Sequence, residues 1–192
     1  MLEHALVGRP YPGQHVSGDT AVVRPLENGL FVAIVDVLWH CPEAHELAVQ
    51  IHDYLSQHAS ADVTGLMTRL HKRLRGTRGA AVGLCAIDAT RRRVEYTGVG
   101  NTVIRRFGST DTRVPSQPGV LGQNMHTPRM QALSLDADDV LVLYTDGVMD
   151  RFSAKDCVSM LQQPPTQLVQ SLLRRFGKDY DDATCIAVRY AP

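Results

Sequence analysis

The sequence lacks the features that mark secreted, membrane-spanning and zinc-ribbon proteins. Its four cysteines lie far apart without a C-x-x-C pair, which argues against a zinc ribbon and a secreted disulfide scaffold. The N-terminus has no charged segment followed by an apolar stretch, and no apolar run approaches the roughly 20 residues that a membrane span needs. We therefore expect a complete cytoplasmic chain with reduced cysteines.

An excess of charge of either sign is also missing. Twenty Lys and Arg balance twenty Asp and Glu, so no overall field attracts the chain to nucleic acid or to an anionic membrane. Arg91-Arg92-Arg93 forms a basic cluster, but no aromatic side chains interleave it as nucleic-acid binding would favour. We interpret this cluster as a solvated turn and strand start, and we expect recognition to depend on a local surface.

Familiar nucleophile motifs are absent as well. The sequence has no P-loop, no G-x-S-x-G elbow and no cysteine in a phosphate-cradling loop. A hydrolase with this sequence would therefore activate a water molecule rather than a side chain.

The patterns that are present predict a single α+β domain over residues 1–192. No repeat or linker divides the chain, and 192 residues suit one domain. Strands are grouped with strands and helices with helices, which favours antiparallel sheets layered with helices. The predicted strands are 19–24, 30–36, 80–87, 93–99, 102–107, 129–135, 140–145 and 183–190. The predicted helices begin at Pro42 and at the N-cap Asp62, and cover 154–161 and 166–176.

Two glycine-containing turns are predicted to form hairpins. Asn28-Gly29 lies between strands 19–24 and 30–36, which should pair antiparallel. Gly100-Asn101 lies between strands 93–99 and 102–107, and we interpret Gly98 to Asn101 as a hairpin turn without a catalytic role.

Four aspartates occupy systematic positions at the ends of predicted strands. Asp19 opens one strand and Asp36 closes its hairpin partner, whereas Asp146 closes another strand and Asp181 precedes the last. The start of an antiparallel strand lies beside the end of its neighbour, so Asp19 and Asp36 share an edge. Asp146 and Asp181 would share one if their strands pair. A single aspartate at a strand end is usually a turn residue, but four in these positions indicate a cluster.

Such a cluster favours bound cations. Like charges within about 4 to 6 Å raise one another's pKa, and hard divalent cations with carboxylate and water ligands, Mn²⁺ or Mg²⁺, remove this conflict. Two ions roughly 3.5 to 4 Å apart can activate a water molecule in line with a phosphoester. The sequence therefore predicts metal-dependent phosphoester hydrolysis at Asp19, Asp36, Asp146 and Asp181.

Short motifs around these aspartates occur in the order of a known family. They are Ser17-Gly18-Asp19, Val35-Asp36, Thr145-Asp146-Gly147 and Asp181-Asp182-Ala183-Thr184, and further matches are Arg78 to Ala81, Gly98 to Asn101 and Gly119 to Gly122. The chain resembles the metal-dependent type-2C (PPM) protein phosphatases, specifically their bacterial SpoIIE-like branch, over almost its entire length. The resemblance implies an antiparallel β-sandwich flanked by helices, in α-β-β-α layers, and a protein serine/threonine phosphatase.

The resemblance also implies roles for individual residues. Asp36 would bridge two metal ions, Asp146 and Asp181 would bind the first, and Asp19 would act on the second, directly or through water. The backbone carbonyl of Val37 would be a further metal ligand.

Two residues beside the aspartates are predicted to support them. We expect the Thr184 hydroxyl to support Asp181 and Gly147 to permit the sharp turn after Asp146.

The loop after Asp36 departs from the family pattern D-G-x-G-H-G. Val37, Trp39 and Cys41 stand at the three glycine positions, so we expect a loop that cannot easily adopt positive φ. His40 matches the family's histidine and could assist proton transfer or phosphate binding, although a surface or capping role is equally compatible. The other histidines near the first helix, which we interpret as surface residues, are His45, His52 and His58.

The expected substrate follows from the small size of the chain. Family members often carry sensor or membrane domains, for which this chain has no room. It is similar to stand-alone members that reset the bacterial stressosome by dephosphorylating serine and threonine on STAS-domain scaffold proteins. Two alternatives remain: a phosphatase for an anti-sigma factor antagonist, and a non-catalytic phosphatase-like module that binds a phosphoprotein.

Overall fold

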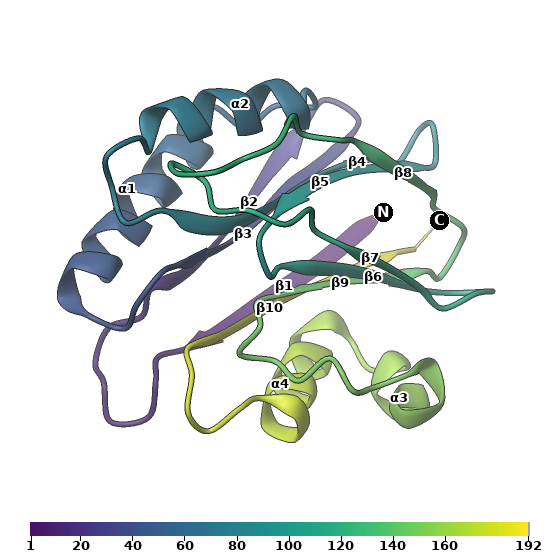
Figure 1. Ribbon diagram of the computed structural model, residues 1–192. Coiled ribbons are helices and arrows are strands. Elements are labelled where there is room, and N and C mark those ends of the chain that lie inside the picture. Colours follow the sequence, from purple (N-terminus) through teal and green to yellow (C-terminus); the bar gives the residue numbers. More distant parts are fainter. Residues whose placement is uncertain (192) are drawn as a thin grey trace.

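The computed structural model describes residues 1–191 as two five-stranded antiparallel sheets between two pairs of helices (Figure 1). One sheet has the order β2-β3-β4-β5-β8 and the other β1-β10-β9-β6-β7. The strands are β1 Leu2–Arg9, β2 Asp19–Leu26, β3 Gly29–Val37, β4 Ala80–Asp88, β5 Arg93–Val99, β6 Val103–Phe107, β7 Thr112–Pro115, β8 Gln131–Ser134, β9 Val140–Tyr144 and β10 Ala183–Tyr190. The helices are α1 Pro42–Gln57, α2 Val63–Arg73, α3 Ala154–Leu161 and α4 Pro165–Phe176. The predicted α-β-β-α sandwich is confirmed.

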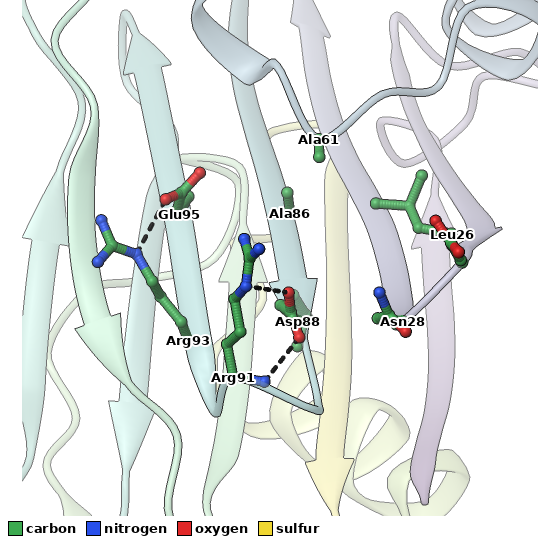
Figure 2. Close-up of a pocket in the computed structure, with 11 residues that line it drawn as sticks. Leu26, Asn28, Ala61, Ala86, Asp88, Arg91, Arg93 and Glu95 are labelled. Carbon is green, nitrogen blue, oxygen red and sulfur yellow. Dashed lines mark hydrogen bonds and ion pairs between the residues drawn. The ribbon is translucent and has the colours of Figure 1, made fainter.

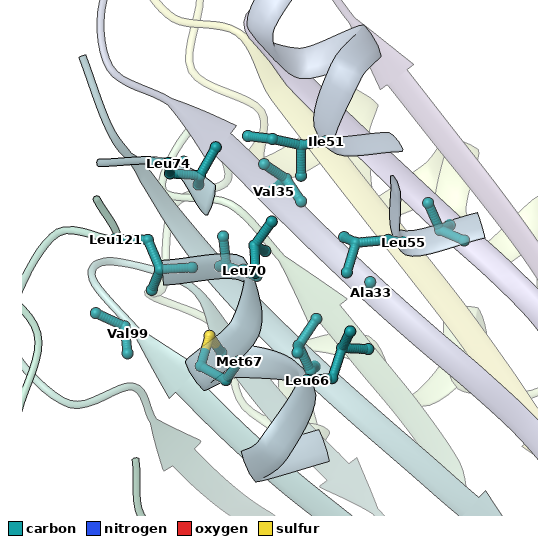
Figure 3. Close-up of a cluster of buried hydrophobic side chains, with 14 of the residues drawn as sticks. Ala33, Val35, Ile51, Leu55, Leu66, Met67, Leu70, Leu74, Val99 and Leu121 are labelled. Carbon is teal, nitrogen blue, oxygen red and sulfur yellow. The ribbon is translucent and has the colours of Figure 1, made fainter. Parts of the chain in front are cut away.

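Alternating faces of the central strands build separate hydrophobic layers. Along β3, Val32 and Ile34 face the other sheet, whereas Ala33 and Val35 face α1 and α2. Figure 3 shows side chains of both helices, including Leu70, packed over Ala33 and Val35. A third cluster joins α3 and α4 to the outer face of the β1-β10-β9-β6-β7 sheet. Because β3 is buried on both faces, its C-terminal end is held rigidly.

The first two helices begin where the sequence predicts. α1 starts at Pro42, and the Asp62 carboxylate caps α2 by accepting a 2.9 Å hydrogen bond from the Gly65 amide. Across residues 1–191, none of the helices has the length and apolar character needed to cross a membrane.

The strand prediction needs three corrections. β1, which was not predicted, pairs with β10 along its whole length, but its exposed edge position leaves little apolar alternation to detect. The short strand β7 was also missed. The hairpin predicted at Gly100-Asn101 is wrong, because β5 pairs with β4 and β8 whereas β6 pairs with β7 and β9. This segment instead crosses from one sheet to the other.

Candidate active site

Asp19 and Asp36 lie side by side at one edge of the β2-β3-β4-β5-β8 sheet. They are directly paired across β2 and β3, as the antiparallel register predicted. Asp19 is buried, with 9% of its surface exposed, whereas Asp36 is partly exposed.

Asp146 and Asp181 come together at an edge of the second sheet. β9 and β10 pair antiparallel, and the Thr145 amide continues the pairing by donating a 3.1 Å hydrogen bond to the Thr184 carbonyl. Asp146 directly follows this contact on one chain segment, and Asp181 precedes it on the other. Gly147 is required here for space, since a Cβ at this position would lie 1.7 Å from the Asp182 carbonyl oxygen.

The hydroxyl of Thr145 connects the two pairs of aspartates. The Thr145 hydroxyl donates a 2.7 Å hydrogen bond to Oδ2 of Asp19 on the opposite sheet. The Thr184 hydroxyl also partly offsets the rise that burial causes in the pKa of Asp19. The support of Asp181 by Thr184 stays a prediction.

The electrostatics of the site show that these carboxyls act on one another. Burial, together with repulsion from Asp146, Asp181 and Asp182, raises the pKa of Asp36 from 3.8 to about 7, against the stabilising hydrogen bond from Asn101. Burial and then the Asp36 charge raise the pKa of Asp19 well above its ordinary value. The structure thus brings all four predicted aspartates into one group.

The loop after Asp36 retains a glycine-like backbone despite its side chains. Trp39 has φ +79°, so the expectation that this loop avoids positive φ is wrong. The Val37 carbonyl oxygen and the Trp39 carbonyl oxygen both lie beside Gly18, where a Cβ would be 3.1 and 3.2 Å from them. The carbonyl that the resemblance names as a ligand therefore lies next to the Ser17-Gly18-Asp19 motif.

His40 belongs to the acidic group, whereas His45, His52 and His58 do not. Its Nε2 lies 3.3 Å from Oδ1 of Asp181, and its Nδ1 lies 3.3 Å from Oδ2 of Asp182. His45, His52 and His58 contact the Ser17 carbonyl, the Asp53 carboxylate and the Tyr54 carbonyl, respectively. His40 is thus placed to exchange a proton with a group bound at the site.

Sequence reasoning missed two residues of the site. The Asn101 side-chain amide donates a 2.8 Å hydrogen bond to Oδ2 of Asp36, although we had interpreted it as a turn residue. Asp182 is buried and accepts hydrogen bonds from the Tyr11 and Gly18 amides at 2.6 and 2.8 Å. Its position in the Asp181-Asp182-Ala183-Thr184 motif could have identified it. Through these two hydrogen bonds, Asp182 holds the β1–β2 loop at the site.

One cavity lies away from these aspartates. It has a volume of about 400 Å³ and is formed by the β2–β3 and β4–β5 turns (Figure 2). Its arginines are already paired, with Arg91 Nε 3.7 Å from Asp88 and Arg93 Nε 2.9 Å from Glu95. The predicted solvated turn is thereby confirmed. A second cavity, of about 290 Å³, borders Asp19 and Thr184 but none of the other predicted aspartates.

The donor set fits a hydrated divalent cation. In residues 1–191, no group of three or more His, Cys, Asp or Glu side chains is arranged closely enough to hold an ion by itself. Mg²⁺ normally keeps several waters and uses one or two carboxylates. Burial and mutual repulsion raise the pKa of Asp36 and Asp19. Carboxyl oxygens in this situation suit such an ion, and cation binding would relieve the repulsion.

Comparison with known proteins agrees with this geometry. Residues 27–191 match the family described as Stage II sporulation protein E (SpoIIE). The chain belongs to the SpoIIE family. It is therefore a type-2C protein serine/threonine phosphatase. A curated member, the phosphoserine phosphatase RsbX of Bacillus subtilis (strain 168), is 24% identical over 138 residues, which cover 71% of this chain and 69% of RsbX.

Solved structures of several chains share this fold. A chain from a study of the bacterial stressosome as a modular system that controls secondary-messenger signalling matches with a TM-score of 0.90 and 25% identity, over 98% of this chain and 100% of that one. RsbX in complex with magnesium matches with a TM-score of 0.82 and 21% identity, over 98% and 94%. The catalytic domain of the phosphatase PstP with two manganese ions has the same fold, with a TM-score of 0.75 and 14% identity over 100% and 99%.

Proposed function

We propose that this SpoIIE-family phosphatase removes phosphate from phosphoserine and phosphothreonine on STAS-domain stressosome proteins in the cytoplasm, with Mn²⁺ or Mg²⁺ as cofactor. The grouping of Asp19, Asp36, Asp146 and Asp181 where the two sheets meet is the observation that carries the chemistry. The similarity to RsbX and to a stressosome chain supports the substrate.

The chain's own residues have distinct tasks in this proposal. Asp36 would be shared between two ions, Asp146 and Asp181 would hold one of them, and Asp19 and the Val37 carbonyl would hold the other. When bound, these ions would lower the pKa of a water molecule and stabilise negative charge on the phosphoester.

The neighbouring side chains orient the ligands and supply a proton. Asn101 fixes the Asp36 carboxylate, and the Thr145 hydroxyl fixes that of Asp19. Nε2 of His40 lies 3.3 Å from Oδ1 of Asp181, so the imidazole is placed to donate a proton to the departing serine oxygen.

The decisive experiment measures phosphate release from a phosphorylated STAS-domain protein of the same genome, with Mn²⁺ and with chelator. We expect turnover that depends on Mn²⁺ and is lost in Asp36→Asn. A phosphorylated anti-sigma factor antagonist, assayed in parallel, tests the alternative substrate. Intact binding without turnover at saturating Mn²⁺ would instead identify a non-catalytic binding module.

A further inference from the structure

Trp39 is the single tryptophan of the chain, and 73% of its surface is exposed beside the candidate active site. It follows Asp36 by three residues and directly precedes His40. The apolar face of an indole gains free energy when it leaves water, so an exposed tryptophan commonly marks a contact surface.

The backbone at Trp39 makes this placement harder to explain by folding alone. Its φ of +79° lies in the left-handed region, which favours glycine and is costly for a residue with a Cβ. The residue belongs to none of the buried clusters of residues 1–191. Neither burial nor backbone preference therefore accounts for tryptophan at this position.

A second exposed aromatic lies across the site. Tyr180, whose surface is 62% exposed, directly precedes Asp181. Nε2 of His40 lies 3.3 Å from Oδ1 of Asp181. Trp39 and Tyr180 immediately precede these two residues in the chain, so both lie beside this contact. Met149, with 38% of its surface exposed, follows Asp146 by three residues. Trp39, Met149 and Tyr180 form what we call the apolar rim of the site.

We propose that Trp39 docks the polypeptide of the phosphoprotein substrate, and that the apolar rim selects segments with apolar residues beside the phosphoserine. This inference rests on the proposed function and specifies its substrate. The charges around the rim support the choice because they are paired within the chain, Asp150 with Arg113 at 2.5 Å and Lys178 with Asp181 at 3.9 Å. Since both cations of these pairs are already matched, an acidic segment gains little from them, whereas an apolar one gains contact with aromatic side chains of the kind that dominate interfaces.

The kinetic test compares a short phosphoserine peptide flanked by leucines with para-nitrophenyl phosphate, which has no polypeptide. In Trp39→Ala we expect kcat/KM for the peptide, divided by that for the small ester, to fall about tenfold. Trp39→Phe should keep most of the wild-type ratio. Phenylalanine has the same backbone strain at this position as alanine, but it retains an aromatic ring. Val158→Ala, which removes an exposed apolar side chain on α3, should leave both activities unchanged.

The binding test does not require turnover and so separates this inference from the proposed function. In the Asp36→Asn variant, all tryptophan fluorescence comes from Trp39, because the chain has a single tryptophan. We expect a blue shift with the leucine-flanked phosphopeptide and a weaker response when aspartates replace the leucines. An unchanged spectrum while titration calorimetry detects peptide binding would overturn the docking role, as would an unchanged kinetic ratio in Trp39→Ala. Absence of turnover in the wild-type chain would count against the proposed function alone.

Discussion

The side-chain amide of Asn101 donates a 2.8 Å hydrogen bond to Oδ2 of Asp36, although the two residues are 65 positions apart. Asn101 lies in the segment that crosses between the sheets, immediately after Gly100. Gly100 has φ +98°, and a Cβ there would lie 2.4 Å from the Ala81 Cβ. Close packing against β4 therefore positions the donor that orients the central carboxylate.

Replacing Asn101 with alanine should weaken metal-dependent activity. Without the donor, the Asp36 carboxylate loses a fixed orientation and the hydrogen bond that opposes its raised pKa. Groups that orient metal ligands typically contribute about 10- to 100-fold in affinity or activity. Initial rates across a Mn²⁺ titration should show a comparable loss. Asn28→Ala, in the distant β2–β3 turn, is the matched control and should behave like the wild type.

The substitution Asp36→Asn should abolish hydrolysis but stabilise the metal-free protein. An asparagine oxygen can still accept the hydrogen bond from Asn101. The substitution also removes one negative charge that is repelled by four neighbouring carboxyl groups. Thermal unfolding in chelator near neutral pH should therefore give a higher melting temperature than the wild type. Equal activity in the two proteins would show that Asp36 is not at the reaction centre.

The same raised pKa predicts how stability depends on pH without metal. The pKa of Asp36 is about 7 in the folded state and about 3.9 in the unfolded state, so the folded state binds more protons between these pH values. The free energy of unfolding should therefore decrease as pH rises through this window, by at most about 4 kcal/mol from this group. Denaturant unfolding of wild type and Asp36→Asn at several pH values isolates the effect. Adding Mg²⁺ should remove most of it, and a flat difference between the two proteins would contradict the assigned pKa.

The sequence was informative wherever a strand buries both faces or a motif ends a strand. The apolar run of β3 and the position of Asp36 at its end predicted both the sheet and its contribution to the site. The edge strand β1 has too little apolar alternation for the same reasoning, because one side of it faces solvent. Asn101 could not be recognised because its role depends on a crossing between sheets, which short-range hairpin rules do not describe.

Buried threonines offer a stability test of the hydroxyl that joins the two sheets. The Thr145 hydroxyl donates to Asp19 at 2.7 Å and accepts from the Thr184 amide at 3.1 Å. Thr145→Val keeps a similar shape but leaves both partners buried without this contact, which should lower the free energy of unfolding by about 2 kcal/mol. Thr97 is equally buried, yet its hydroxyl has no hydrogen-bond partner within residues 1–191. Thr97→Val should accordingly be neutral or stabilising. Chemical denaturation of both variants measures the difference directly, and equal losses would show that the hydroxyl of Thr145 adds nothing beyond its packing.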